Sequence, residues 1–475
     1  KYWDIIIYNY LKSKNIVIPL KTERGDKFGK FEGAYVKEPQ VGMHKWVMSF
    51  DLNSLYPHLI MQYNISPETL VSQNKVPNMK VEKLLNKEFD TSALNKHHTM
   101  TPNGAIFRTD KKGFLPQLME DMYNTRTEYK KKMLEAKQEY ENTKDKKLLK
   151  DISRYNNIQM AKKISLNSAY GAIGNAYFRY YNLLIAEGIT TSGQLSIRWI
   201  ESALNRYLNK VCGTTKEDFV VASDTDSVYI TFDRLVNSAV KKGQDTTRIE
   251  RVSRIINALD SFAKDKIEPF IDKSYSELAS YLNCHSQRMN MKREVIADKA
   301  IWTAKKRYIL NAWDIEGVRY KEPNLKMMGI EAVKSSTPAP CRQKIKEALK
   351  IIMSGDEKML NTFIQDFRKE FMSLPPEEIA YPRSVNGLRK WTDTANLFKK
   401  GAPIHVKGAI LYNHLVRKNK LDKKYVYILE GDKIKFLHLR LPNKYQSTAI
   451  TFITKLPKEL DFHSIIDYDI QYEKS

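Results

Sequence analysis

Three aspartates stand where the sequence predicts the ends of strands. Asp51 follows WVMSF, an apolar run that is typical of a buried strand. Asp224 and Asp226 lie at the polar centre of FVVASDTDSVYITF, whose flanking apolar runs predict a β-hairpin. Two carboxylates side by side repel each other and raise each other's pKa. A bound cation would relieve that repulsion.

Taken singly, each aspartate has a structural explanation. Asp51 could cap the next segment, and one aspartate in a turn often hydrogen-bonds its own backbone. If the strand end and the hairpin converge, their oxygens suit Mg²⁺, which prefers hard ligands and retains water. Two such ions roughly 4 Å apart can hold the attacking and the leaving oxygen of a phosphoryl transfer. The pattern therefore favours a metal-dependent phosphoryl-transfer site.

The stretch KKISLNSAYGAIGN places unlike side chains on one helix face. Lys163, Asn167, Tyr170 and Gly174 recur at intervals of four, three and four residues, which makes one helical stripe. Lys163 would neutralise phosphate, Asn167 would hydrogen-bond it, and Tyr170 would pack near a base pair. Gly171 and Gly174 would allow close approach. The alternative is a solvated basic helix face.

Further cations point to a polyanionic partner. Lys and Arg number 79 and Asp and Glu 55, so the net charge is +24. Nucleic acid is the first candidate, an acidic membrane surface the second, and a basic surface without a special partner the third. Arg126 could face the phosphates beside Lys163 with its fork geometry. KKRY (305–308) and KMMGIEAVKSST (326–337) could track a phosphate backbone, or they are simply Lys-rich turns.

The elements that must position these residues can be read from the periodicity. Long helices are predicted from Leu115 to about Lys150 and from about Asp151 to Tyr181, with ENTKDKK as the hairpin tip between them. Other elements follow, in chain order: a helix over 1–20 ending near Pro19, a helix from near Pro57, a helix over 189–213, helical structure over 245–290, a strand–turn–strand unit over 291–314, and helices mixed with short strands from about Lys334. Two polar stretches, 22–33 and 241–248, predict connectors.

The chain of 475 residues is 42% hydrophobic, enough for about three domains with sizeable cores. Its three widely spaced cysteines form no disulfide framework and no Cys/His metal pattern. No apolar run approaches the roughly 18 residues that a membrane span needs.

The motifs, taken together and in order, resemble a known family. DLNSLYP with Asp51, KKISLNSAYGAIGN with Lys163, and SDTDS with Asp224 and Asp226 resemble motifs A, B and C of the family B DNA polymerases. KKRY and KMMGIE resemble the primer-binding segments that follow motif C. The surrounding text, including AYFRYYNL and GAILYNH, resembles the replicative polymerases of T-even-type bacteriophages. The resemblance covers essentially the whole chain.

The resemblance implies an α+β, right-hand polymerase fold with an antiparallel-sheet palm, helical-hairpin fingers and a mixed, mainly helical thumb. It places the palm in residues 1–113, with a small insert at 65–113, and in residues 184–333. The fingers would be residues 114–183 and the thumb residues 334–475.

The implied activity is that of a DNA-directed DNA polymerase, which adds dNTPs to a primer 3′-OH by two-metal-ion nucleotidyl transfer in phage DNA replication. It would act on primer–template DNA in the cytoplasm of an infected bacterium. Two Mg²⁺ ions would be held by Asp51, Asp226 and the carbonyl of Leu52, with Asp224 assisting. Tyr56 would exclude a 2′-hydroxyl, and Lys163 could protonate the leaving pyrophosphate. The implied nucleotide-binding residues are Ser54, Leu55, Tyr56, Arg126, Lys163, Asn167 and Tyr170. The implied DNA-binding residues are Gly171, Lys305, Lys306, Arg307, Tyr308, Lys326, Gly329 and Lys334.

The sequence also departs from the family pattern. Ala222-Ser223 stands where Tyr-Gly is usual, and Lys292 stands where an acidic residue is expected, although Glu294 could still lie near the metals. About 50 residues precede Asp51, too few for the 3′–5′ exonuclease domain of relatives. The Asp-x-Glu of that domain has a counterpart in NAWDIEG (Asp314 and Glu316), but in the wrong place, so we expect no catalytic part for it. We expect a truncated or naturally split polymerase, with a separate exonuclease chain or a sliding clamp as further partners.

Other functions fit fewer of these residues. A nucleic-acid-binding scaffold, or an inactive half of a split polymerase, would not need the intact carboxylates. An RNA-templated polymerase would favour a Tyr-x-Asp-Asp hairpin and a small residue or Phe in place of Tyr56. A protein-primed polymerase would need longer insertions than residues 65–113 provide. An unrelated metal-dependent nuclease would not explain the stripe that contains Lys163.

Overall fold

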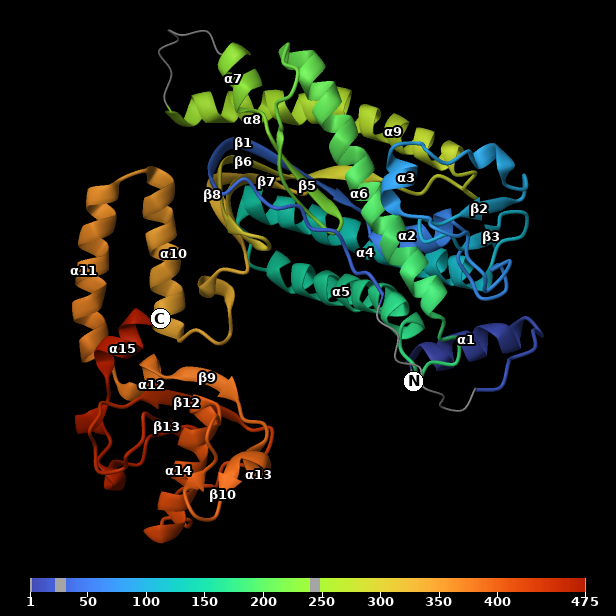
Figure 1. Cartoon of the computed structure of the whole chain (residues 1–475). Coiled ribbons are helices and arrows are strands. Elements are labelled where there is room, and N and C mark those ends of the chain that lie inside the picture. The colour runs from blue at the N-terminus through green and yellow to red at the C-terminus, as the bar shows by residue number, and fades with distance from the viewer. Residues whose placement is uncertain (1, 22–30, 240–247, 475) are drawn as a thin grey trace. The chain divides into compact units, whose positions relative to one another are not determined.

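A computed structural model describes residues 2–21, 31–239 and 248–474 (Figure 1). The two predicted connectors, 22–33 and 241–248, lie largely outside the described residues. The chain divides into two compact units, Lys1–Lys326 and Met327–Ser475. Each unit has its own hydrophobic core.

A six-stranded sheet organises the first unit, with the strand order β4-β5-β1-β6-β7-β8. β1 pairs antiparallel with both β5 and β6, which sets Asp51 opposite Ser227 on one side and Lys292 on the other. The end of β1 therefore lies between the β4–β5 hairpin and β6. The strands of this sheet are β1 (Gly42–Leu52), β4 (Val220–Asp224), β5 (Ser227–Thr231), β6 (Met291–Ala304), β7 (Arg307–Ile315) and β8 (Val318–Met328).

The two faces of the sheet are packed differently, because successive side chains of a strand point to opposite faces. Met48, Phe50 and Leu52 of β1 belong to the large core that includes the neighbouring helices. Val47 belongs to a smaller cluster with Tyr229 and other strand residues. The residues that follow on the Val47 face are Ser49 and Asp51, so Asp51 points away from the large core.

Helices surround this sheet (Figure 1). α4 and α5 lie side by side as an antiparallel pair joined by residues 144–147, which confirms the predicted helical hairpin and its tip. α8, the π-helix η2 and α9 follow one another without a break. The helices of the first unit are α1 (Tyr2–Ser13), α2 (Leu55–Gln62), α3 (Val81–Leu85), α4 (Phe114–Thr143), α5 (Leu148–Ile173), α6 (Leu183–Cys212), α7 (Asp233–Ala239), α8 (Arg248–Phe262), α9 (Glu268–Tyr281), η1 (Thr91–Ala93) and η2 (Ala263–Ile267). A small sheet pairs β2 (His98–Met100) with β3 (Ile106–Arg108).

Several helix ends differ from the prediction, including that of α4, which ends at Thr143 rather than near Lys150. α1 ends at Ser13, not near Pro19, and Asn15 just beyond it adopts a positive φ of 54°, which breaks a right-handed helix. α5 ends at Ile173, with Gly174 as its C-cap, rather than at Tyr181. α6 begins at Leu183, before the predicted residue 189, since the side chain of Asn182 accepts a hydrogen bond from the N–H of Ile185 at 3.1 Å.

The second unit combines helices with a three-stranded sheet of order β13-β12-β9. α14 lies so close to β13 that a Cβ on Gly408 would come within 2.4 Å of Thr451 Oγ1. The helices of the second unit are α10 (Ala339–Ser354), α11 (Glu357–Ser373), α12 (Pro376–Ile379), α13 (Leu388–Trp391), α14 (Ile404–Lys418), α15 (Tyr468–Glu473), η3 (Glu331–Val333), η4 (Lys458–Leu460) and η5 (His463–Ile465). Its strands are β9 (Tyr381–Ser384), β10 (Thr392–Asp393), β11 (Leu397–Phe398), β12 (Lys433–His438) and β13 (Ala449–Phe452).

The predicted α+β class is confirmed by this mixture of helices and antiparallel sheet. The boundary between the units falls between Lys326 and Met327, whereas the sequence suggested a boundary before residue 334. The division into palm, fingers and thumb stays a prediction. Within the described ranges, none of the helices has the length and apolar character needed to cross a membrane.

Candidate active site

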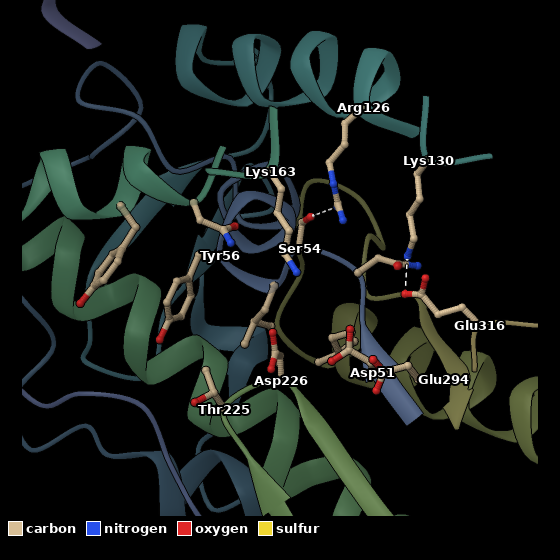
Figure 2. A pocket seen from close by; sticks show the side chains of 15 residues that line it. Asp51, Ser54, Tyr56, Arg126, Lys130, Lys163, Thr225, Asp226, Glu294 and Glu316 are labelled. Atoms are coloured by element: carbon tan, nitrogen blue, oxygen red, sulfur yellow. Dashed lines mark hydrogen bonds and ion pairs between the residues drawn. The ribbon is translucent and has the colours of Figure 1, made fainter. Parts of the chain in front are cut away.

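One pocket of the first unit gathers most of the predicted site residues (Figure 2). Its volume is about 280 Å³, and its walls come from the end of β1, the start of α2, the facing sides of α4 and α5, and the β4–β5 hairpin. It is lined by Asp51, Leu52, Asn53, Ser54, Leu55, Tyr56, Arg126, Lys130, Lys163, Asn167, Tyr170, Thr225, Asp226, Glu294 and Glu316.

Three of the four carboxylates in the lining, Asp51, Asp226 and Glu294, form the acidic side of this pocket. The N–H of Leu52 donates to the carbonyl of Asp226 at 2.8 Å, which joins the hairpin to the end of β1. Burial, followed by the charges of Asp226 and Glu294, raises the pKa of Asp51 well above its ordinary value. Burial, followed by the charge of Asp224, raises the pKa of Asp226 to about 6. The folded chain therefore holds negative charge here at a free-energy cost, and a cation would offset that cost.

Cationic side chains form the opposite wall (Figure 2). The charge of Lys163 opposes the pKa increases of both Asp51 and Asp226. Arg126 is only 7% exposed, and its Nη1 donates to Ser54 Oγ at 2.7 Å. Burial lowers the pKa of Arg126, and its Nε has no hydrogen-bond partner among the described residues. Lys163 and Arg126 thus provide nitrogen donors at the pocket that could bind an anionic ligand.

The start of α2 supplies backbone donors to the same space. Ser54 caps α2 in a left-handed conformation, with φ of 47°, and the residues that follow it form the first turn of α2. First-turn N–H groups have no intrahelical partner and suit anions. The ring of Tyr56 lies 4.6 Å from that of Tyr170, centroid to centroid, and burial raises the pKa of Tyr56 to about 12. A Cβ on Gly193 of α6 would come within 3.3 Å of Tyr56, so the glycine lets α6 support α2 closely.

The donor set can be compared with the needs of a metal ion. Across the described parts of the chain, no cluster of three or more His, Cys, Asp and Glu side chains is arranged to hold one. Of the four carboxylates in the lining, Glu294 and Glu316 are paired with Lys326 and Lys130. Asp51 and Asp226 remain as candidate ligands, together with the backbone of Leu52. Mg²⁺ commonly takes one or two carboxylates and completes its shell with waters and substrate phosphates. An oxygen-only, incomplete donor set of this kind fits Mg²⁺.

Ten predicted site residues line the pocket together: Asp51, Leu52, Ser54, Leu55, Tyr56, Arg126, Lys163, Asn167, Tyr170 and Asp226. Asp224 does not line it. The Asp224 Oδ1 atom instead accepts from Lys306 Nζ at 2.5 Å, on the other side of the hairpin. Asp224 therefore acts on the pocket through its neighbours: its charge contributes to the raised pKa of Asp226, and its Oδ1 accepts from the hydroxyl of Thr225 at 2.9 Å.

The predicted DNA-contacting residues have varied surroundings. Lys305 pairs with Glu38 at 3.1 Å, and Lys326 pairs with the pocket carboxylate Glu294 at 2.6 Å. A Cβ on Gly171 would meet nothing within 4 Å in the described structure, so this glycine leaves open space. Tyr308 is largely buried, unlike the neighbouring lysines. It is 4% exposed, and its hydroxyl is 2.7 Å from that of Tyr229, because its ring packs in the strand cluster.

The remaining predicted DNA contacts, Arg307, Gly329 and Lys334, lie outside the pocket lining. Arg307 begins β7. Gly329 and Lys334 belong to the second unit, where Lys334 pairs with Glu331 at 2.9 Å.

Sequence reasoning missed Asn53, Lys130, Thr225 and Glu316 in the lining. Lys130 follows Arg126 by four residues on α4, and this helical spacing could have revealed it. The prediction that Asp314 and Glu316 do not form an exonuclease site is not tested, but Glu316 does line this pocket and pairs with Lys130 at 2.7 Å.

The two sequence departures are accommodated away from the pocket. Ser223 is 1% exposed and donates to Glu201 at 3.3 Å. Lys292 pairs with Glu268 of α9 at 3.0 Å, so its charge is directed toward the helices. Glu294, in contrast, does reach the pocket, as expected.

Comparison with known sequences identifies the family. Residues 4–257 match the sequence model for DNA polymerase family B, which is more than half of the chain. The chain belongs to DNA polymerase family B. Aligned over its full length, it is 35% identical to a DNA-directed DNA polymerase of Escherichia phage RB69 and 34% identical to that of Enterobacteria phage T4. It is also 31% identical, over 46% of its length, to a DNA polymerase delta catalytic subunit of Arabidopsis thaliana, of which it covers 18%.

The family B chain spans 57% of the length of each of the two phage proteins. Their similarity confirms the resemblance to T-even-type phage polymerases. Family B polymerases generally use divalent metal ions, which agrees with the oxygen donors at Asp51 and Asp226. The matched range includes both aspartates and the whole α4–α5 pair.

Proposed function

We propose that this chain is a DNA-directed DNA polymerase of phage replication, which adds deoxynucleotides to a primer 3′-hydroxyl under the direction of a template. One observation carries the proposal. Carboxylates from two separate segments, Asp51 and Asp226, share a pocket with the cations Arg126 and Lys163. Negative groups for a metal and positive groups for phosphates on facing walls are what nucleotidyl transfer requires.

Each wall has a part in the proposed reaction. The N–H groups at the start of α2 and the side chains of Arg126, Lys163 and Asn167 bind and orient the triphosphate of the incoming nucleotide. The 3′-hydroxyl oxygen forms a bond to the α-phosphorus, the bond to pyrophosphate breaks, and the hydroxyl proton passes to water. Lys163 would give a proton to the leaving pyrophosphate. Tyr56, fixed against Tyr170, lies under the sugar and excludes a 2′-hydroxyl.

Asp51, Asp226 and the carbonyl of Leu52 would hold the two Mg²⁺ ions, which lower the barrier by polarising the reacting oxygens when bound. Burial, followed by the charge of Asp224, raises the pKa of Asp226, and burial, followed by the charge of Asp226, raises that of Asp51. These shifts support the assignment, since a functional cation site is one reason to retain such carboxylates. Asp224 has an indirect part, because it is paired with Lys306.

The DNA-binding set follows as a further part of the proposal. The sheet of the first unit would be the palm, α4 and α5 the fingers, and the second unit the thumb. Gly171, Lys305, Lys306 and Arg307 in the first unit, with Gly329 and Lys334 in the second, would contact primer–template backbone. Lys306 and Lys326 would exchange their carboxylate partners for phosphate when DNA binds, whereas Tyr308 would support the turn from beneath.

Primer extension on a short template with Mg²⁺ and dNTPs tests the function. The chain should elongate the primer by template-directed addition, and Asp226→Asn should abolish elongation. Glu217→Gln is a matched control, because Glu217 is a partly exposed carboxylate of the same unit, paired with Arg234 at 2.9 Å. DNA binding without extension by the unsubstituted chain would instead favour a scaffold, or a part that needs another chain.

A further inference from the structure

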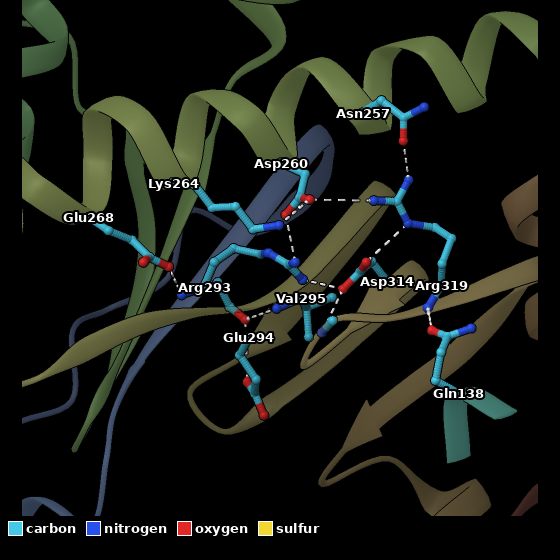
Figure 3. Close-up of polar contacts among 12 residues, drawn as sticks. Gln138, Asn257, Asp260, Lys264, Glu268, Arg293, Glu294, Val295, Asp314 and Arg319 are labelled. Atoms are coloured by element: carbon cyan, nitrogen blue, oxygen red, sulfur yellow. Dashed lines mark hydrogen bonds and ion pairs between the residues drawn. The ribbon is translucent and has the colours of Figure 1, made fainter. Parts of the chain in front are cut away.

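The segment Asp314-Ile315-Glu316 has no place in the chemistry proposed above, yet its polar contacts are dense (Figure 3). The side chain of Asp314 is 2% exposed, and both of its oxygens are used. Oδ1 accepts from Arg293 Nη1 and from the N–H of Gly317 at 3.0 Å, and Oδ2 accepts from Arg319 Nε at 3.0 Å. A buried carboxylate with three donors is held in one position.

Asp314 thereby fixes the turn between β7 and β8. Glu316 and Gly317, the two residues of this turn, have positive φ of 52° and 86°. A two-residue hairpin loop with both φ positive is a type I′ turn, and a side chain at its first position is strained. The hydrogen bond from Gly317 to Asp314 and one of 2.6 Å from the N–H of Glu316 to the carbonyl of Glu294 hold it there.

The same cluster reaches three other elements. Arg293 of β6, 5% exposed, also donates to Asp260 of α8 at 2.7 Å. Arg319 of β8 donates through Nη1 to Asn257 of α8 at 2.6 Å, and its N–H donates to Gln138 of α4 at 3.2 Å. Helix α8, strands β6, β7 and β8, and helix α4 are therefore tied together at the Asp314 carboxylate.

The opposite side of these strands faces the pocket. Arg293 points to α8, while its neighbour Glu294 lines the pocket. Glu316 lines it too and pairs with Lys130 of α4. α4 thus has two polar contacts with the sheet here: the ion pair of Lys130 with Glu316, and the hydrogen bond between Gln138 and Arg319. Both contacts involve residues of the β7–β8 hairpin, whose turn Asp314 fixes.

We infer that Asp314 and Arg293 are positioning residues for nucleotide binding, because they fix the β7–β8 turn so that Glu316 holds Lys130 and α4 at the pocket. The inference rests on the proposed polymerase function. Preorganised binding groups avoid an ordering cost when a ligand arrives. Loosening the turn should therefore weaken binding of the incoming nucleotide more than it slows the reaction of bound nucleotide.

Steady-state primer extension in two backgrounds tests this. Asp314→Asn should raise the KM for the deoxynucleotide by about tenfold, with a smaller change in kcat, because binding groups are misplaced. In a Glu316→Gln background the same substitution should raise KM by less than about threefold, since the ion pair between Glu316 and Lys130, through which Asp314 acts, is already absent. Ser274→Ala is the control. It removes a buried 3.0 Å hydrogen bond to Trp199 in the same unit and should change KM little in either background.

The outcomes separate the inference from the function it rests on. Equal effects of Asp314→Asn in both backgrounds would overturn the inference alone. No extension by the unsubstituted chain would overturn the proposed function and the inference with it. Should Asp314→Asn fail to fold, Arg319→Gln removes one contact of Asp314 from a side chain that is 33% exposed. It should raise KM in the same background-dependent way, and an equal rise in both backgrounds would again overturn the inference.

Discussion

Replacing Asp226 by asparagine should stabilise the first unit while removing activity. The pKa of Asp226 is about 6 in the folded chain, against 3.8 for an unperturbed aspartate. At 1.36 kcal/mol per pKa unit, holding this carboxylate ionised at neutral pH costs about 3 kcal/mol. Asparagine has nearly the same shape and no charge, so Asp226→Asn should raise the free energy of unfolding by about that amount when no divalent ion is present.

The sign of the pH dependence follows from the direction of the shift. Because the folded pKa is the higher one, the cost is absent below about pH 3.8, grows between pH 3.8 and 6, and is complete above pH 6. The stabilisation by Asp226→Asn should therefore be full at pH 7.5 and small at pH 4. Added Mg²⁺ should narrow the difference at pH 7.5, since it would bind the aspartate form and not the asparagine form.

Denaturant unfolding in EDTA, followed by tryptophan fluorescence, measures the effect. Five of the six tryptophans precede Met327, so the signal reports chiefly on the first unit. Glu217→Gln, at a partly exposed ion pair, should stay within about 0.5 kcal/mol of the unsubstituted chain. Asp226→Asn that is neutral or destabilising at pH 7.5 would refute the electrostatic reasoning about the pocket.

Three further predictions concern the salt dependence of DNA binding, stability at low pH and the packing of the second unit. DNA affinity should fall at least about 100-fold between 50 and 200 mM salt, because several phosphate contacts release counterions, and a flat titration would contradict the proposed backbone contacts. Burial lowers the pKa of His58 to about 4, so stability should fall by up to about 3 kcal/mol as the pH drops from about 6.5 to 4, and His58→Gln should flatten that stretch of an unfolding series. Gly408→Ala should destabilise the second unit by several kcal/mol in thermal unfolding, because its Cβ would come within 2.4 Å of Thr451 Oγ1. Gly355→Ala has open space around its Cβ but a φ of +82°, so it should cost only about 1–2 kcal/mol.

Local sequence patterns are sufficient to predict those parts of the site that are formed by residues close together in the chain. Lys163, Asn167 and Tyr170 were expected on one helix face, and they line one wall of the pocket. The hairpin with Asp226 at its tip was also expected, because alternating apolar residues and a polar turn specify it locally. The spacing of Arg126 and Lys130 carries the same kind of information, since residues four apart share one face of a helix.

The features of the site that could not be predicted depend on contacts between strands that are far apart in the sequence. Nothing near Asp224 indicates that Lys306, on another strand, would take its side chain away from the pocket. The position of the Asp314–Glu316 motif after KKRY indicates only that it is not the exonuclease motif, whereas strand pairing brings Glu316 next to the pocket. Such contacts depend on strand order and register, which a single sequence does not fix.

The order of the strands has a consequence for folding. The pocket carboxylates Asp51, Asp226 and Glu294 come from β1, the β4–β5 hairpin and β6, which are neighbours in the sheet but are separated along the chain by most of the first unit. Neither helical hairpins nor isolated strand pairs bring all three together, so their convergence needs non-local contacts, which form slowly. Ion binding at this pocket should therefore report the last stage of refolding, after the helices have formed and the sheet has closed around β1.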